Sequence, residues 1–112
     1  MKTKLIPQIG DEVRAKGHLV KEYFKDEKIR TWVAKNYERP VKGIYIGKRT
    51  LYYGTIDWNR DSNQYFKPTG AFPAYLVVTH PRKKPIYVYE HDLEFWEGDE
   101  WVTITSYNQG DQ

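Results

Sequence analysis

The residues in this chain that are best placed for chemistry are cations that lie near aromatic rings. Arg30 and Trp32 are two positions apart, so an extended strand would put both side chains on one face. When proteins recognise single-stranded nucleic acid, cations follow the phosphates and rings stack on the bases. In protein interfaces, Tyr and Trp supply large contact areas. The candidate partner-binding residues are Arg30, Trp32, Lys48, Arg49, Tyr52, Tyr53, Trp58, Arg82, Lys83 and Lys84.

Each of these residues also has a simpler explanation. In so small a domain, tryptophans such as Trp32 and Trp58 are more often packing residues of the core or rim. The basic run Arg82–Lys84 lies between two prolines, where it would also keep a sheet edge soluble. The sequence leaves both explanations open at these positions.

The same inspection finds no constellation for catalysis. The three histidines, His18, His80 and His91, are far apart, and serine occurs only at Ser62 and Ser106. Nucleophile-elbow, phosphate-loop and zinc-protease motifs are absent from the sequence. Cysteine is absent too, which excludes a thiol nucleophile and a zinc–thiolate site. We therefore expect no enzyme activity, no cofactor and no bound metal.

Charge is divided unevenly along the chain. Residues 1–89 hold all 18 basic and eight acidic residues, a net charge of +10, whereas residues 90–112 hold seven acidic residues and no basic ones. The acidic segment would either pack on the basic body and neutralise it, or leave one of the two surfaces free for a charged partner.

The elements that must position these residues are β-strands. Ile29, Thr31 and Val33 alternate with Arg30, Trp32 and Ala34, a period typical of a strand. Residues 13–24 allow either an amphipathic helix or a strand that turns at 25–28, and Gly17 favours the strand. Further strands are expected at 41–47, 51–58, 74–79, 86–90 and 101–107. Connections are expected at 36–40, at Lys48-Arg49-Thr50, over 59–70 and over 80–85, and a one-turn helix near residues 91–94.

Five to seven short strands separated by turns predict an all-β fold, most economically a small, partly open barrel. We expect one domain over residues 1–112, with the barrel at about 9–95 and an acidic C-terminal strand and tail at 96–112. No apolar run approaches the roughly 20 residues of a membrane span, and the N-terminus lacks the apolar core of a signal peptide. These features predict a cytoplasmic protein without a membrane partner.

Three segments resemble SH3-like barrels. They are the opening Gly10-Asp-Glu-Val-Arg14, the middle Gly43–Leu51 followed by Gly54, and the late strand and turn Ile86–Glu94. The middle segment is similar to small uncharacterised phage and prophage proteins. SH3-like barrels bind proline-rich peptides, methylated tails, RNA or DNA, so the resemblance implies a fold rather than one ligand. The clustered acidic loop and paired tryptophans of PxxP-binding members are missing here.

The sequence as a whole predicts a non-catalytic binding module, and the resemblance implies that it is encoded by a phage or prophage. Its expected partner is a protein, recognised through exposed aromatic residues and a charged surface. The alternative is a protein that binds single-stranded nucleic acid through basic loops and stacking rings. The acidic segment after residue 89 favours the first prediction because it would repel phosphates. A monomer or a weak homo-oligomer is expected.

Overall fold

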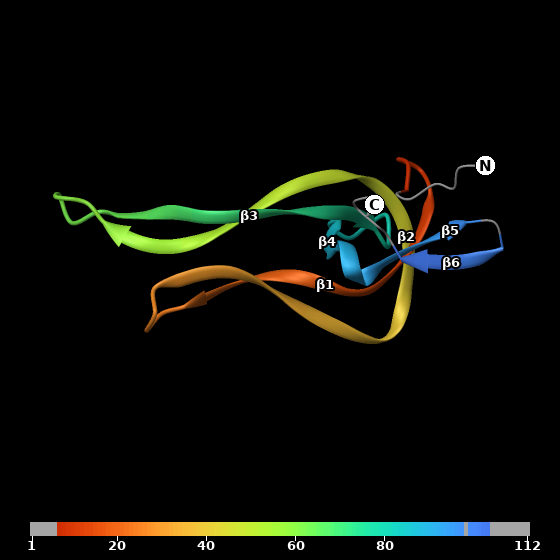
Figure 1. Cartoon of the computed structure of the whole chain (residues 1–112), viewed down its shortest axis with the longest axis horizontal. Helices are drawn as coiled ribbons and strands as arrows, with labels where there is room; N and C mark the ends of the chain where they lie inside the picture. Colours follow the sequence, from red (N-terminus) through yellow and green to blue (C-terminus); the bar gives the residue numbers. More distant parts are fainter. Residues whose placement is uncertain (1–6, 98, 104–112) are drawn as a thin grey trace, which may run out of the picture.

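The computed structural model describes residues 7–97 and 99–103, in which the chain folds as an all-β antiparallel protein (Figure 1). Its elements are β1 (Glu12–Phe24), β2 (Ile29–Trp58), β3 (Gln64–Val78), β4 (Ile86–Tyr89), a 3-10 turn η1 (Glu90–Asp92), β5 (Leu93–Glu97) and β6 (Glu100–Thr103). They form one six-stranded sheet in the order β2-β3-β4-β1-β5-β6. The all-β prediction is confirmed.

Strand β2 closes most of this sheet into a ring because it pairs with two neighbours. Its first part pairs with β1, and its second part pairs with β3. Strand β4 bridges the gap between β3 and β1, but it meets β1 through a single residue pair, Leu19 with Tyr87. The result is a ring of four strands that is not quite a barrel.

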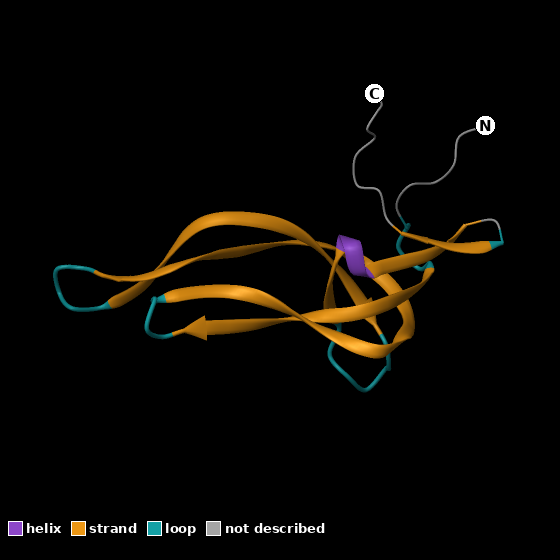
Figure 2. Cartoon of the chain, turned by 60° about the horizontal axis from the view of Figure 1, so that its bottom comes forward, coloured by secondary structure: helices purple, strands orange, loops and turns teal. Residues whose placement is uncertain are grey.

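Two long hairpins extend from this ring in the same direction (Figures 1 and 2). We define the first arm as residues 17–24 of β1 paired with 29–36 of β2. The second arm is residues 51–58 of β2 paired with 64–72 of β3. The arms make the molecule elongated, with principal dimensions of 58 × 40 × 23 Å.

The prediction of short strands is confirmed for β4, β5 and β6 and wrong for β1, β2 and β3. Three expected connections lie partly or wholly within the long strands. Residues 36–40 belong to β2, which is 30 residues long. The β1–β2 register passes from the pair Gly17–Asn36 to the pair Ala15–Val41, so residues 37–40 lie opposite an irregularity where β2 bends. Proline has no backbone N–H group to donate to a neighbouring strand. Pro40 lies at the irregularity, where it has no pairing partner on β1, so no hydrogen bond between the strands is lost there.

Lys48 and Arg49, predicted at a turn, lie inside β2 and pair with Tyr75 and Ala74 of β3. The long loop expected at 59–70 is confined to residues 59–63, and β3 begins at Gln64. Polar side chains are compatible with strands here because a two-stranded arm exposes much of its surface to water.

Other predictions of local structure are confirmed. Residues 13–24 form a strand that turns at 25–28, as the Gly17 argument favours. Residues 80–85 are a loop, and the predicted short helix appears as the 3-10 turn η1. The strand expected at 101–107 is present as β6 up to residue 103, and its remainder lies outside the described residues.

Two apolar clusters hold the fold together. The main core contains Val13, Ala15, Tyr45, Tyr75, Val77, Val88, Leu93 and Phe95, with Tyr37, Ile86 and Val102 packed against it. A smaller cluster of Leu19, Leu51 and Ala74 lies where the arms meet the ring, and Trp32, Phe72, Tyr87 and Tyr89 pack against it. Full burial of one large apolar side chain is worth about 1.5–3 kcal/mol, so the main core dominates stability.

The C-terminal acidic hairpin of β5 and β6 adds to the sheet along β1. Glu94 accepts a hydrogen bond from Arg14 Nε at 2.8 Å and lies 3.8 Å from Lys16 Nζ. The Arg14 guanidinium also lies 4.6 Å from the ring of Trp101, which meets Trp96 edge-on. Glu94 therefore neutralises part of the basic body, as one of the two charge hypotheses predicts.

Candidate binding cleft between the two arms

Two cavities lie in succession between the arms, and together we call them the inter-arm cleft. The proximal cavity, of about 420 Å³, is lined by Leu19, Thr31, Trp32, Ala34, Tyr53, Ala71, Phe72 and Tyr89. The distal cavity, of about 380 Å³, is lined by Tyr23, Arg30, Ile56, Gln64, Tyr65 and Phe66. Each cavity takes residues from both arms, so the fold assembles the cleft from segments that are distant in sequence.

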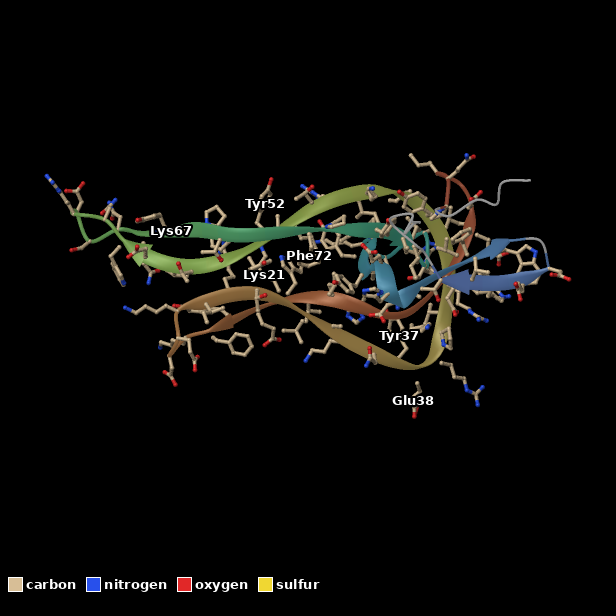
Figure 3. All side chains as sticks on the ribbon, in the orientation of Figure 1. Lys21, Tyr37, Glu38, Tyr52, Lys67 and Phe72 are labelled. Carbon is tan, nitrogen blue, oxygen red and sulfur yellow. The ribbon has the colours of Figure 1, made fainter. Side chains whose placement is uncertain are left out.

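Aromatic rings form a connected surface along the proximal cavity. Phe72 contacts Tyr89 edge-on with ring centroids 5.5 Å apart, and Tyr53 lies 6.4 Å from Phe72. Trp32 meets Tyr87 edge-on at 5.4 Å. Figure 3 shows Phe72 projecting into the space between the arms and Tyr52 pointing away from it. Packed rings give a rigid surface, so a ligand that binds there loses little affinity to side-chain ordering.

Two hydrogen bonds fix the arms relative to each other. The Ile56 N–H donates to the carbonyl of Lys28 at 2.8 Å, near the tip of the first arm. Trp32 Nε1–H donates to the carbonyl of Tyr52 at 3.1 Å. The second bond links the Trp32 indole of the first arm to the backbone of the second arm. Trp32 packs against the smaller apolar cluster and also lines the proximal cavity.

Gly70 gives the Tyr53 ring its position. A Cβ atom at residue 70 would collide with the phenol ring of Tyr53 on the neighbouring strand. The ring therefore lies over the glycine backbone, where it reaches Phe72.

The cleft has positive charge beside it and no carboxylate in its described lining. The Arg30 guanidinium lies 4.2 Å from the centre of the Phe66 ring, and Lys21 Nζ lies 5.3 Å from that of Trp32. Arg49 donates from Nη1 to the Tyr87 hydroxyl at 3.0 Å. Each of these three contacts joins one residue that the sequence analysis singled out to one that it did not.

Three of the predicted partner-binding residues line the cleft, namely Arg30, Trp32 and Tyr53. Arg49 lies outside the lining and bonds to Tyr87, whose ring packs against Trp32. Its neighbour Lys48 lies on the opposite face of β2, where its Nζ is 5.8 Å from the Tyr75 ring.

The other five predicted residues lie elsewhere on the surface. Tyr52 is 56% exposed on the outer side, and Trp58 is 49% exposed at the end of β2. Arg82, Lys83 and Lys84 are exposed in the β3–β4 loop. That loop and the turn after Trp58 are at opposite ends of the 15-residue β3, on the order of 45 Å apart along the strand. The structure therefore does not gather the predicted basic residues on one face.

Sequence reasoning missed several lining residues. Leu19 and Tyr23 are an even number of positions apart in β1, so the two-residue period of a strand predicts that they share one face, and both line the cleft. Phe66, Phe72 and Tyr89 belong to strands whose approach to the first arm depends on the bend in β2. No local pattern encodes that approach.

Residues 7–97 and 99–103 contain no group of three His, Cys, Asp or Glu side chains arranged to hold a metal ion. Within the same ranges, no helix has the length and apolar character needed to cross a bilayer. Burial raises the pKa of Tyr37, Tyr45 and Tyr75, all of which belong to the main core or pack on it rather than line the cleft.

The comparisons with known proteins name no relative. No family model, curated protein or solved structure matches this chain.

Proposed function

We propose that this protein is a non-catalytic binding module whose inter-arm cleft binds an extended segment of a protein partner. The observation that carries the proposal is the proximal cavity, where Trp32, Tyr53, Phe72 and Tyr89 surround a space of about 420 Å³ with no charged residue in its lining. Such a concave aromatic surface accepts apolar side chains of a partner.

The elongated shape of the cleft supports an extended ligand. The arms are strands, and the two cavities follow them in succession from Tyr89 to Gln64. A peptide in an extended conformation places alternate side chains on one face at a matching spacing. Its apolar side chains would enter the cavities while its backbone follows the arms.

Single-stranded nucleic acid is the second candidate, and one observation favours it. Lys21 and Arg30 lie against aromatic rings at the cleft, the combination that binds phosphates and bases. Two features weigh against it: the proximal cavity has no cation in its lining, and the loop with Arg82, Lys83 and Lys84 lies away from the cleft. We therefore place protein recognition first.

The finer expectations from the sequence stay predictions. They are an SH3-like barrel, an origin in a phage or prophage, a cytoplasmic location, and a monomeric or weakly associating state. The ring of β1, β2, β3 and β4 supports the first of these, since it is the part of the sheet that approaches barrel closure.

A blocking substitution tests the proposed function. Ala71 lines the proximal cavity and is exposed, so Ala71→Glu places a charged side chain in the cavity without truncating the core. Thr50→Glu is the matched control, because Thr50 is exposed on the paired strand and lines neither cavity. Wild-type and variant proteins would be immobilised and panned against a library of random displayed peptides.

We expect wild type and Thr50→Glu to enrich the same peptides and Ala71→Glu to enrich none of them. Binding of a fluorescent oligothymidylate at ~50 mM salt is measured in parallel, since non-specific affinity for nucleic acid is greatest at low salt. Peptide binding that is unaffected by Ala71→Glu contradicts the proposal. Oligothymidylate binding without peptide binding selects the second candidate.

A further inference from the structure

Arg30 and Trp32 divide the inter-arm cleft into two unlike subsites. They are two residues apart on one strand, so their side chains leave the same face about 6.6 Å apart. Arg30 lines the distal cavity, and Trp32 lines the proximal one. One strand therefore presents a cation and a large ring at the repeat distance of an extended peptide.

The Arg30 side chain is held in a way that leaves it able to bind an anion. Its guanidinium stacks on the Phe66 ring at 4.2 Å, which fixes the plane of the group and leaves the N–H donors at its edge. In the part of the chain that the structure describes, the ion pairs join Arg14 and Lys16 to Glu94, and none involves Arg30. A planar guanidinium suits bidentate binding of a carboxylate.

The surrounding charges favour an acidic ligand at this point. Arg30 is the single charged residue among those described as lining the two cavities. Asp57 lies outside both linings, where its Oδ2 accepts a 3.5 Å hydrogen bond from the hydroxyl of Tyr65. A carboxylate entering the distal cavity would therefore meet positive potential without an opposing acid in the lining.

We propose that the inter-arm cleft selects extended protein segments that carry an acidic residue and an aromatic or large aliphatic residue two positions apart. The carboxylate binds Arg30 in the distal cavity, and the apolar side chain enters the proximal cavity against Trp32, Phe72 and Tyr89. This inference rests on the proposed function and names the chemistry of its partner.

The lining of the cleft has a cation in the distal cavity and none in the proximal one, and this difference favours a peptide over nucleic acid. A phosphodiester backbone carries a charge at every nucleotide. It would therefore bring an anion to the proximal cavity as well as to the distal one. The lining of the proximal cavity has no cation to receive it, whereas a peptide can alternate charged and apolar side chains.

The test uses the peptides recovered on the wild-type protein. Arg30→Gln removes the proposed carboxylate ligand. Arg39→Gln is the matched control, because Arg39 is an exposed arginine of β2 that lines neither cavity. Fluorescence anisotropy would compare each recovered peptide with an analogue in which glutamine replaces the acidic residue, so the peptide pair tests the proposal on wild type alone.

We expect recovered peptides to have an acidic and an apolar residue two positions apart. On wild type and Arg39→Gln, the glutamine analogue should bind about tenfold more weakly, as expected for loss of a charge-assisted hydrogen bond. On Arg30→Gln, acid and amide should bind equally, with the apolar preference retained.

Three outcomes would overturn the inference. The first is equal binding of acid and amide on wild type, and the second is a preference for acidic and apolar residues in adjacent positions. In either case, if Ala71→Glu still abolishes binding, the proposed function survives and only the partner chemistry is wrong. The third is that wild type recovers no peptide, which overturns both proposals.

Discussion

Burial raises the pKa of three tyrosines, two in the main core and one packed against it. Burial raises the pKa of Tyr37 and Tyr45 above the ordinary value of 10.0. For Tyr75, burial is the main cause, and the negative charge of Glu90 and the neighbouring Tyr45 raise its pKa further. The neutral phenol is therefore the form that the native fold favours.

We predict that the protein loses stability in alkaline solution as these tyrosines ionise. Their native pKa values exceed the unfolded value of 10.0, so the native state binds more protons than the unfolded state above that pH. The stabilisation is complete below pH 10.0 and is lost as pH rises through the native pKa values. Phenolate absorbance should show some tyrosines titrating late, together with unfolding. Tyr37→Phe should reduce the late absorbance change, and titration of every tyrosine near pH 10 in the folded protein would contradict this prediction.

At the scale of the element, the β5–β6 hairpin belongs to the core as well as to the charge balance. Phe95 of β5 is 1% exposed and packs in the main core, and it pairs with Val13 of β1. The acidic C-terminal segment is therefore fixed to the body by apolar contacts in addition to the Arg14–Glu94 ion pair.

We predict that Phe95→Ala lowers the free energy of unfolding by about 3–5 kcal/mol, the usual cost of truncating a buried phenylalanine. Ile9→Ala is the control, because Ile9 is 73% exposed and its truncation should cost well under 1 kcal/mol. Chemical denaturation followed by circular dichroism would measure both. If the two variants have the same stability, the hairpin does not contribute to the core.

Most elements could be predicted from the sequence, but their continuity could not. The alternation over residues 29–34 and the turn at 25–28 are local signals, and both were read correctly. Pro40 lies in a segment that the sequence predicts as a connection, yet it belongs to β2, at the bend. Gly47 ends the strand expected at 41–47, yet β2 continues through it at a register shift with φ of 149°. Proline and glycine occur both where a strand bends and where it ends. Whether β2 bends or ends at these residues depends on its pairing with β1 and β3, which the local sequence does not show.

The residues of the cleft, like the strands, could be predicted from local sequence only in part. Arg30 and Trp32 could be placed on one face from their spacing, and both line the cleft. The sequence predicts a turn at Lys48 and Arg49, which would let both side chains reach one partner, but both are strand residues, and adjacent strand residues face opposite sides. Phe72 and Tyr89 were missed because their contact depends on how β3 and β4 meet the first arm.

At the scale of the whole molecule, the arms account for its extended shape. The Cα radius of gyration is 16.8 Å, whereas a compact domain of 112 residues has about 13 Å. Hydrophobic residues make up only 39% of the chain, and the buried residues of the main core all lie outside the arms. The arms are instead exposed ribbons that surround a cleft.

We predict an elongated monomer in solution. Light scattering should give a mass of 13.4 kDa, and small-angle X-ray scattering should give interatomic distances that extend to at least 58 Å. A compact monomer with a radius of gyration of about 13 Å would show that the arms fold back. A mass of twice this value at every concentration would contradict the monomer and indicate that a second copy contributes to the measured shape.

The sharing of β2 between both arms sets where the chain can tolerate a change in length. Side chains alternate along a strand, so one residue inserted at the bend, within 37–40, would reverse the alternation relative to one of the arms. The cleft-facing residues of that arm would then point outward. Residues added in the turns 25–28 or 59–63 leave the alternation of β2 intact and only lengthen an arm. Relatives with longer or shorter arms are therefore expected to differ at the tips, while the bend keeps its number of residues.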